Sequence, residues 1–329
     1  MKKITAMILL LAMVLALAAC SGGTNADDKN TDSSEDTYTI GVLYLDQEVL
    51  LSEATAGCQA YAAEHSNVKL IEYNANKDVS TQLKQCENLI SQNVDAIALT
   101  PVDGAGCDQI INACKDAGIP LICFHAKVKG APITNILFDN VGFGKMQVDY
   151  AMEIFEKSGG DMNGTINVGI VTGKLDNQNA VERCQGYEEQ LKNYANATIV
   201  DEQVGSWNRD DAMAIAENWI TSGRDIDIIL SNNDAMAIGI SLAYANANVE
   251  RPIIIGVGGT EEGLTAILNG DFDGTVFQPA YQNGYDAIDF TVKYLNGETL
   301  EESYVTEGVL VTPETAQATL DDLNAMLNS

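Results

Sequence analysis

The chain has 329 residues and is strongly acidic, with 18 Lys and Arg residues against 47 Asp and Glu residues and a net charge of -29. This charge excludes nucleic-acid binding, which needs a basic face to neutralise phosphates, and it argues against adhesion of the protein surface to anionic lipid. The acidic residues are dispersed along the chain, which is typical of a solvated, exported surface.

The N-terminus has the pattern of a secretory signal. Met1-Lys2-Lys3 is a short positive start, and residues 4–19 are apolar apart from Thr5. This run is shorter than the ~20 residues that a membrane-spanning helix needs, so we expect residues 1–19 to be a cleaved signal peptide. Leu17-Ala18-Ala19-Cys20 resembles the bacterial lipobox, which implies a lipid on Cys20. The alternative is an ordinary cleavage site that a cysteine follows by chance.

Residues 20–37 are predicted to be the lipidated cysteine and a flexible tether. Residues 21–37 are rich in Ser, Gly, Thr, Asn and Asp, and they contain no apolar side chain larger than Ala26. Such a segment buries too little apolar surface to order itself. We therefore expect an extracytoplasmic protein that a lipid anchors to the outer face of the cell membrane, with the folded part beginning near Tyr38.

The remaining cysteines are predicted to be buried free thiols. Their even number permits disulfides in an exported protein, but none has CxxC spacing and most fall in apolar patterns, where cysteine acts as a small hydrophobe. The six are Cys58, Cys86, Cys107, Cys114, Cys123 and Cys184. Because the only histidines are His65 and His125, we expect no zinc site. No other metal and no cofactor is expected.

Strand-like and helix-like segments alternate along the rest of the chain. Helical spacing is seen, for example, at Leu83, Cys86, Leu89 and Ile90. The strand-like runs are residues 39–45, 68–73, 94–100, 120–125, 133–138, 166–172, 197–204, 226–231, 252–257, 274–277 and 304–311. This alternation predicts an α/β fold of parallel sheets flanked by helices.

The alternating units form two sets, one ending near residue 138 and one running from about residue 166 to 257. Two such sheets would place a ligand crevice at the carboxyl ends of their strands. The segments that follow the predicted strands contain amides, carboxylates, one guanidinium, one indole and one imidazole. Planar amides, carboxylates and guanidinium groups pair with neighbouring hydroxyls, and an indole offers a flat wall to a sugar ring. These groups indicate a small polar ligand.

From residue 38 onward the chain resembles the type I periplasmic binding proteins, in particular the galactose- and ribose-binding group. The strongest match is Ser231-Asn232-Asn233-Asp234-Ala235-Met236-Ala237-Ile238-Gly239, at a predicted strand–helix joint. Supporting matches are Asp139-Asn140-Val141-Gly142, Arg183-Cys184-Gln185-Gly186, Ile254-Ile255-Gly256-Val257 and Gly274-Thr275-Val276-Phe277-Gln278.

The resemblance implies two similar lobes joined by a three-segment hinge. Residues 38–139 with 279–306 would form the N-terminal lobe, and residues 140–278 with 307–329 the C-terminal lobe. The hinges would lie near residues 139–140, 278–279 and 306–307, and a ligand between the lobes would favour a closed form.

The resemblance also implies roles for individual side chains in ligand binding. Asn233 would bond two ring hydroxyls, Arg183 would reach a hydroxyl or ring oxygen, and Trp207 would stack on the sugar. The other implied binding residues are Gln47 or Glu48 after the first strand, His125 after the fourth, Asn177, Asn179 and Gln278.

The chain departs from the sugar binders at three positions. Gly258 stands where they usually have an aspartate, His125-Ala126 where they often have Asp-Arg or Asn-Lys, and Leu50 or Leu51 where they have an aromatic residue. Each lost partner would leave a buried hydroxyl unsatisfied at a cost of roughly 1–3 kcal/mol. The ligand therefore stays open between a different sugar, a polyol, a modified sugar and a less hydroxylated molecule.

Each candidate also has a purely structural interpretation. Trp207 could be a core residue, Arg183 a surface charge, and His125 a wall residue; if His125 does line the site, binding should weaken as the pH falls through its titration. Asn233 and Asp234 could be a helix N-cap pair, and we expect Asp234 to be the cap.

We expect the solute receptor of an ABC importer, monomeric and docking on a membrane permease. The alternatives are a sensor that signals to a membrane receptor or kinase, and a binder of a non-sugar small molecule. An enzyme is not expected, because no GxSxG nucleophile motif and no His/Cys cluster occur. A repressor would need an N-terminal helix-turn-helix, and the signal and tether stand in its place.

Overall fold

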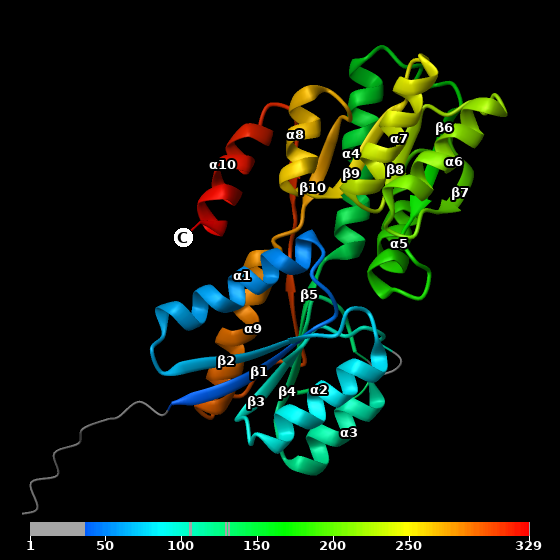
Figure 1. Cartoon of the computed structure of the whole chain (residues 1–329). Helices are drawn as coiled ribbons and strands as arrows, with labels where there is room; N and C mark the ends of the chain where they lie inside the picture. The colour runs from blue at the N-terminus through cyan, green and yellow to red at the C-terminus, as the bar shows by residue number, and fades with distance from the viewer. Residues whose placement is uncertain (1–36, 105–106, 129, 131, 329) are drawn as a thin grey trace, which may run out of the picture. The chain divides into compact units, whose positions relative to one another are not determined.

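The structure is a computed structural model that describes residues 37–104, 107–128, 130 and 132–328. These residues belong to one unit of the chain, Asp36–Ser329. They form two six-stranded sheets, each with helices packed against it (Figure 1). The predicted fold of two α/β lobes is confirmed.

The first sheet has the order β11-β5-β4-β3-β1-β2, and all its neighbouring strands are parallel. Its strands are β1 (Tyr38–Tyr44), β2 (Val68–Asn74), β3 (Ala96–Leu99), β4 (Leu121–Phe124), β5 (Thr134–Phe138) and β11 (Ser303–Thr306). The helices that pack on this sheet or on one another are α1 (Val49–Glu64), α2 (Val79–Ser91), α3 (Asp108–Ala117) and α9 (Ala280–Leu295). We call this sheet and its helices the N-lobe.

The second sheet has the order β12-β10-β9-β8-β6-β7, in which only the β10–β12 pair is antiparallel. Its strands are β6 (Ile166–Thr172), β7 (Ala197–Val204), β8 (Ile228–Ser231), β9 (Ile253–Gly258), β10 (Gly274–Phe277) and β12 (Val309–Val311). Its helices are α4 (Asn140–Lys157), α5 (Gln178–Leu191), α6 (Arg209–Thr221), α7 (Asp234–Ala247), α8 (Glu261–Asn269) and α10 (Ala316–Leu327). We call this group the C-lobe.

The chain passes between the two sheets three times: after β5, after β10 and between β11 and β12. The prediction of one strand over residues 304–311 was wrong, because this segment is divided between the two sheets. Gly308 lies at the break, and a Cβ atom there would come within 2.6 Å of the Phe143 ring. The crossing segment thus runs too close to α4 for a larger residue.

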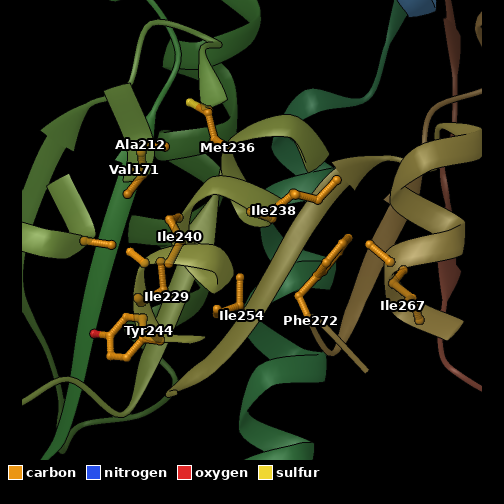
Figure 2. Close-up of a cluster of buried hydrophobic side chains, with 14 of the residues drawn as sticks. Val171, Ala212, Ile229, Met236, Ile238, Ile240, Tyr244, Ile254, Ile267 and Phe272 are labelled. Carbon is orange, nitrogen blue, oxygen red and sulfur yellow. The ribbon is translucent and has the colours of Figure 1, made fainter. Parts of the chain in front are cut away.

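The central strands are buried on both faces, as expected for parallel strands covered by helices. Every residue of β3, β4 and β8 is buried. In the C-lobe, side chains of the sheet interlock with those of α7, and Ile229, Ile254, Ile240 and Phe272 lie in one cluster (Figure 2). The packed core holds the strand ends, and the loops that follow them, in place.

Five of the six cysteines after Cys20 are buried, and Cys184 is partly buried. No disulfide joins the cysteines of the described residues, although Cys86 Sγ and Cys114 Sγ lie 3.6 Å apart between α2 and α3. Burial raises the pKa of the Cys58 and Cys107 thiols to about 12. These side chains therefore act as small hydrophobic groups, as predicted.

The predicted signal peptide, the Cys20 lipidation site and the tether lie, apart from residue 37, outside the described residues. Within the described ranges, no helix is both long enough and apolar enough to cross a membrane.

The contact between α1 and α9 depends on two glycines. A Cβ atom on Gly57 would come within 1.9 Å of the Tyr281 carbonyl oxygen, and one on Gly284 within 1.9 Å of the Ala54 carbonyl oxygen. Because both obstacles are helix backbone, a side chain would force the two helices apart.

We therefore expect Gly284→Ala to lower the free energy of unfolding by about 1–3 kcal/mol, measured by urea denaturation of the protein from residue 21 onward. The control is Gln282→Ala on the exposed side of the same helix, which should change stability by less than about 0.5 kcal/mol. Equal stability of the two variants would contradict the close helix contact.

Candidate ligand-binding site

Arg183 of α5 lies at the centre of the predicted site, with 3% of its surface exposed. Its Nε donates to Asn140 Oδ1 at 3.0 Å, Nη1 to the Asn232 carbonyl oxygen at 2.5 Å, and Nη2 to Gln278 Oε1 at 2.6 Å. Burial lowers the pKa of this guanidinium to about 10, so it is still charged at neutral pH. The interpretation of Arg183 as a surface charge is wrong.

The three acceptors of Arg183 come from three different parts of the C-lobe. Asn140 begins α4, Asn232 follows β8, and Gln278 follows β10. Guanidinium has five N–H donors, and these bonds use three of them. Arg183 thus joins the ends of two strands and the start of a helix, and two of its donors bond no group among the described residues.

His125 and Asn179 connect the two lobes. Asn179 Nδ2 donates to the His125 carbonyl oxygen at 3.3 Å, and Asn179 Oδ1 accepts from Asn140 Nδ2 at 3.2 Å. His125 has a φ of 69°, and its ring packs edge-on against Phe138 with the centroids 5.4 Å apart. Its Nδ1 is buried without a hydrogen-bond partner among the described residues.

Burial, and then the charge of Arg183, lower the pKa of His125 to about 4. The imidazole is therefore neutral throughout the physiological range. The expectation that binding weakens as His125 titrates consequently applies well below pH 6, not near neutrality.

Asn233 rather than Asp234 caps α7, so the expected assignment of the cap was wrong. Asn233 Oδ1 accepts from the Met236 amide at 2.9 Å, and its Nδ2 donates to the Trp207 carbonyl oxygen at 3.3 Å. Asp234 is buried beneath the loop after β9, where it accepts from the Gly259 amide at 2.7 Å and from Thr275 Oγ1 at 2.6 Å. The buried aspartate holds the β9–α8 loop against β10.

Trp207 stands in the β7–α6 loop and is partly buried, with a φ of 67°. Its indole covers Gly173, where a Cβ atom would come within 2.2 Å of the ring. The Arg183 guanidinium carbon lies 5.6 Å from the ring centroid. Trp207 therefore has a core contact on one side and closes the site beside Arg183.

A cavity of about 300 Å³ lies beside Trp207 and has walls from both lobes. The N-lobe contributes Glu48 and Lys77, and the C-lobe contributes Lys174, Ser206, Trp207, Asn208 and Asp211. A larger surface hollow of about 480 Å³ lies elsewhere on the C-lobe, around Asp201 and Trp219, and none of the predicted site residues lines it.

Gln47 and Glu48 are exposed at the start of α1. Glu48 forms an ion pair with Lys77, and Lys77 Nζ also lies 3.4 Å from Asp46 Oδ2. Exposed pairs of this kind contribute little to stability. Of these two candidates only Glu48 lines the cavity, and the Gln47 side chain forms no hydrogen bond within the described residues.

Asn177 caps α5 by accepting from the Asn179 amide at 2.9 Å. Asn140 and Asn232 were not among the predicted site residues, although both stand in the quoted motifs and both bond Arg183. Their motif positions were the available signal. Lys174 in the cavity wall had no such signal, because an isolated loop lysine looks like a solvated charge.

Two α/β lobes, three chain crossings and a cluster of polar side chains at the strand ends define an interlobe solute-binding protein. The periplasmic binding protein domain family matches residues 42–299 of this chain. The chain belongs to this family. Its members are solute receptors located outside the cytoplasm, so the prediction that the protein is not an enzyme is confirmed.

Named relatives have a similar length and fold. A xylitol-binding protein of Mycolicibacterium smegmatis is 30% identical over 94% of this chain and 84% of its own. A putative rhizopine-binding protein of Rhizobium meliloti is 29% identical over 78% of this chain and 84% of its own. A Bacillus halodurans ABC transporter solute-binding protein, solved with bound myo-inositol, has a TM-score of 0.78 and 29% identity, covering 87% of this chain and 98% of its own.

The neutral His125 makes a prediction about stability against pH. An unfolded histidine binds a proton below about pH 6.5, whereas the folded one resists protonation down to about pH 4. The free energy of unfolding therefore falls by about 1–3 kcal/mol as the pH falls through this window. We expect His125→Asn, which tolerates the positive φ, to remove part of this loss in denaturation curves between pH 4 and 7.

The comparison is between the slopes of stability against pH, because acidic side chains also titrate near pH 4 and are common to both proteins. Gln282→Ala, which removes no titratable group, is the control, and it should leave the slope as it is in the unaltered protein. Identical slopes for His125→Asn and the unaltered protein would mean that the folded state binds a proton at His125 as readily as the unfolded chain does.

Proposed function

We propose that this protein captures a neutral polyol or sugar between its two lobes and delivers it to an ABC importer. The observation that supports this most is the Arg183 cluster, formed by Arg183, Asn140, Asn232 and Gln278. Within the described residues its buried guanidinium bonds amide and carbonyl oxygens and leaves two donors unused. A hydroxylated ligand presents oxygens that such donors can bond. Arg183, Asn233, Gln278, Asn179 and His125 would form the polar part of the site.

Polyols fit the departures from the galactose- and ribose-binding pattern. Relatives named for xylitol and rhizopine, and a structural neighbour solved with myo-inositol, are among the proteins similar to this chain. A polyol offers hydroxyls without requiring the aspartate that Gly258 replaces or the aromatic wall that Leu50 or Leu51 replaces. Trp207 would supply the apolar wall, and Glu48 and Asn177 would lie at the outer edge.

Delivery to a membrane permease would follow from closure of the lobes. In this proposal residues 38–139 with 279–306 move as one lobe and residues 140–278 with 307–329 as the other. The hinge segments would be the three crossings, near Phe138, Phe277 and Thr306. The protein would act as a monomer whose closed form docks on the permease of an ABC importer.

The ligand proposal predicts a thermal shift. Against the protein from residue 21 onward, myo-inositol, xylitol and a panel of pentoses and hexoses should include at least one compound that raises Tm, since a ligand of the folded form alone stabilises it by mass action. Trp207→Ala and Asn233→Ser should each abolish the shift, the second while keeping a side chain able to cap α7.

Glu87→Ala, at an exposed position of α2, is the control and should retain the full shift. Calorimetry on each hit then gives Kd. Absence of a shift with every sugar and polyol, together with a shift by an anionic compound, would sink the proposal and turn Arg183 into an anion-binding group.

Membrane attachment is proposed to depend on a lipid at Cys20. In a bacterial host the full chain should partition with membranes and incorporate labelled palmitate, whereas Cys20→Ser should lose the label. Stable anchoring needs two acyl chains, and a single chain gives only marginal membrane affinity. Because Cys20→Ser carries no acyl chain at this position, nearly all of this variant should be released from the membranes. Palmitate incorporation by Cys20→Ser would contradict the lipobox interpretation, and Cys58→Ser serves as the control.

A further inference from the structure

Glu53 is a buried acid for which the fold provides no partner. It lies in the second turn of α1 and is 4% exposed. Among residues 37–104, 107–128, 130 and 132–328 it forms no hydrogen bond and no ion pair. A buried polar group without a partner destabilises the folded state, so its retention at this position calls for a reason beyond folding.

The position of Glu53 on α1 directs it towards the C-lobe. Its neighbours Ala54 and Gly57 form the contact with α9, close to Gly284 and Tyr281. Glu53 lies one turn before Gly57, nearer to the start of α1, where Glu48 lines the cavity beside Trp207. The chain enters α9 from β10, so this part of α1 faces the end of the C-lobe sheet.

The charge that shifts the pKa of Glu53 belongs to a residue of the C-lobe. Burial, and then the negative charge of Asp234, raise the pKa of Glu53 to about 8. Both oxygens of Asp234 are already engaged: Oδ1 accepts from Thr275, and Oδ2 accepts from the amides of Gly259 and Thr260. Of the two facing acids, Glu53 alone has free hydrogen-bonding capacity.

Gly258 leaves space beside this pair of acids. It ends β9 with a φ of 142°, and a Cβ atom there would come within 2.9 Å of Asp234 Oδ2. The strand end that could have supplied a C-lobe side chain next to Asp234 therefore supplies none. Glu53, from the N-lobe, lies close enough to this aspartate for the charge of Asp234 to raise its pKa.

We propose that Glu53 is a ligand-binding residue, which bonds a hydroxyl of the neutral polyol or sugar from the N-lobe side, opposite Asn233 and Gly258. The inference rests on the proposed function, because it concerns the same interlobe site. A carboxyl that keeps its proton at neutral pH both donates and accepts, as a hydroxyl does, so the two groups can exchange a pair of hydrogen bonds. Glu53 would thereby help to select hydroxylated ligands.

The first test measures Kd by calorimetry for whichever of myo-inositol, xylitol and the sugar panel binds the unaltered protein. Glu53→Gln keeps the size and both hydrogen-bonding functions, and it should stay within about threefold of the original Kd. Glu53→Ala should raise Kd at least about tenfold, and Glu87→Ala should leave it unchanged. A Glu53→Ala variant with the original Kd overturns the role of Glu53 while the proposed function stands.

The second test needs no ligand and uses Glu53→Leu. If Glu53 is retained for binding, its replacement by an apolar side chain of similar length removes a desolvation cost and raises the Tm of the unliganded protein by about 1–3 °C. A lower Tm for Glu53→Leu would show that the carboxyl supports the fold, and this would overturn the inference even if every compound of the panel fails to bind.

Discussion

The burial of the Arg183 guanidinium is the constraint on which the arrangement of the site depends. Removing a cation from water costs several kcal/mol unless hydrogen bonds inside the protein compensate for the lost water. The acceptors here are Asn140, the Asn232 carbonyl and Gln278, which come from the start of α4 and from the ends of β8 and β10. These segments must keep their relative positions for the charge to stay satisfied, so the polar wall is preorganised before a ligand arrives.

Around this charge, the remaining groups divide into those that build the wall and those that stay free to bind. Asp234 fastens the β9–α8 loop, and Asn177 caps α5. By contrast, among the described residues His125 Nδ1 is buried without a partner, the buried Glu53 forms no hydrogen bond, and two donors of Arg183 are unused. His125 and Glu53 belong to the N-lobe and Arg183 to the C-lobe, so groups with unused hydrogen-bonding capacity come from both lobes. Their distribution fits a ligand that contacts both lobes at once.

Much of this could be predicted from the sequence. Alternation of strand and helix patterns indicated two α/β units, and polar residues after strands indicated the cleft, because parallel strands end at one edge of a sheet. The roles of neighbouring residues could not be predicted in this way. Asn233 and Asp234 are both good caps by type, and only the position of the β9–α8 loop makes Asp234 an internal anchor. Residues 304–311 read as one strand because their pattern has no signal for a change of sheet.

Local chemistry and periodicity therefore determined the class of fold, the positions of most strands and the family resemblance. These properties depend on residues close together in the chain. The tertiary structure decided which polar groups are already satisfied: Arg183 by three distant segments, Asp234 by another loop, and Glu53 by no group in the part of the chain that the structure describes. Partners in a hydrogen-bonded site come from positions far apart in sequence, so the unspent capacity that a ligand can use is known only once the chain is folded.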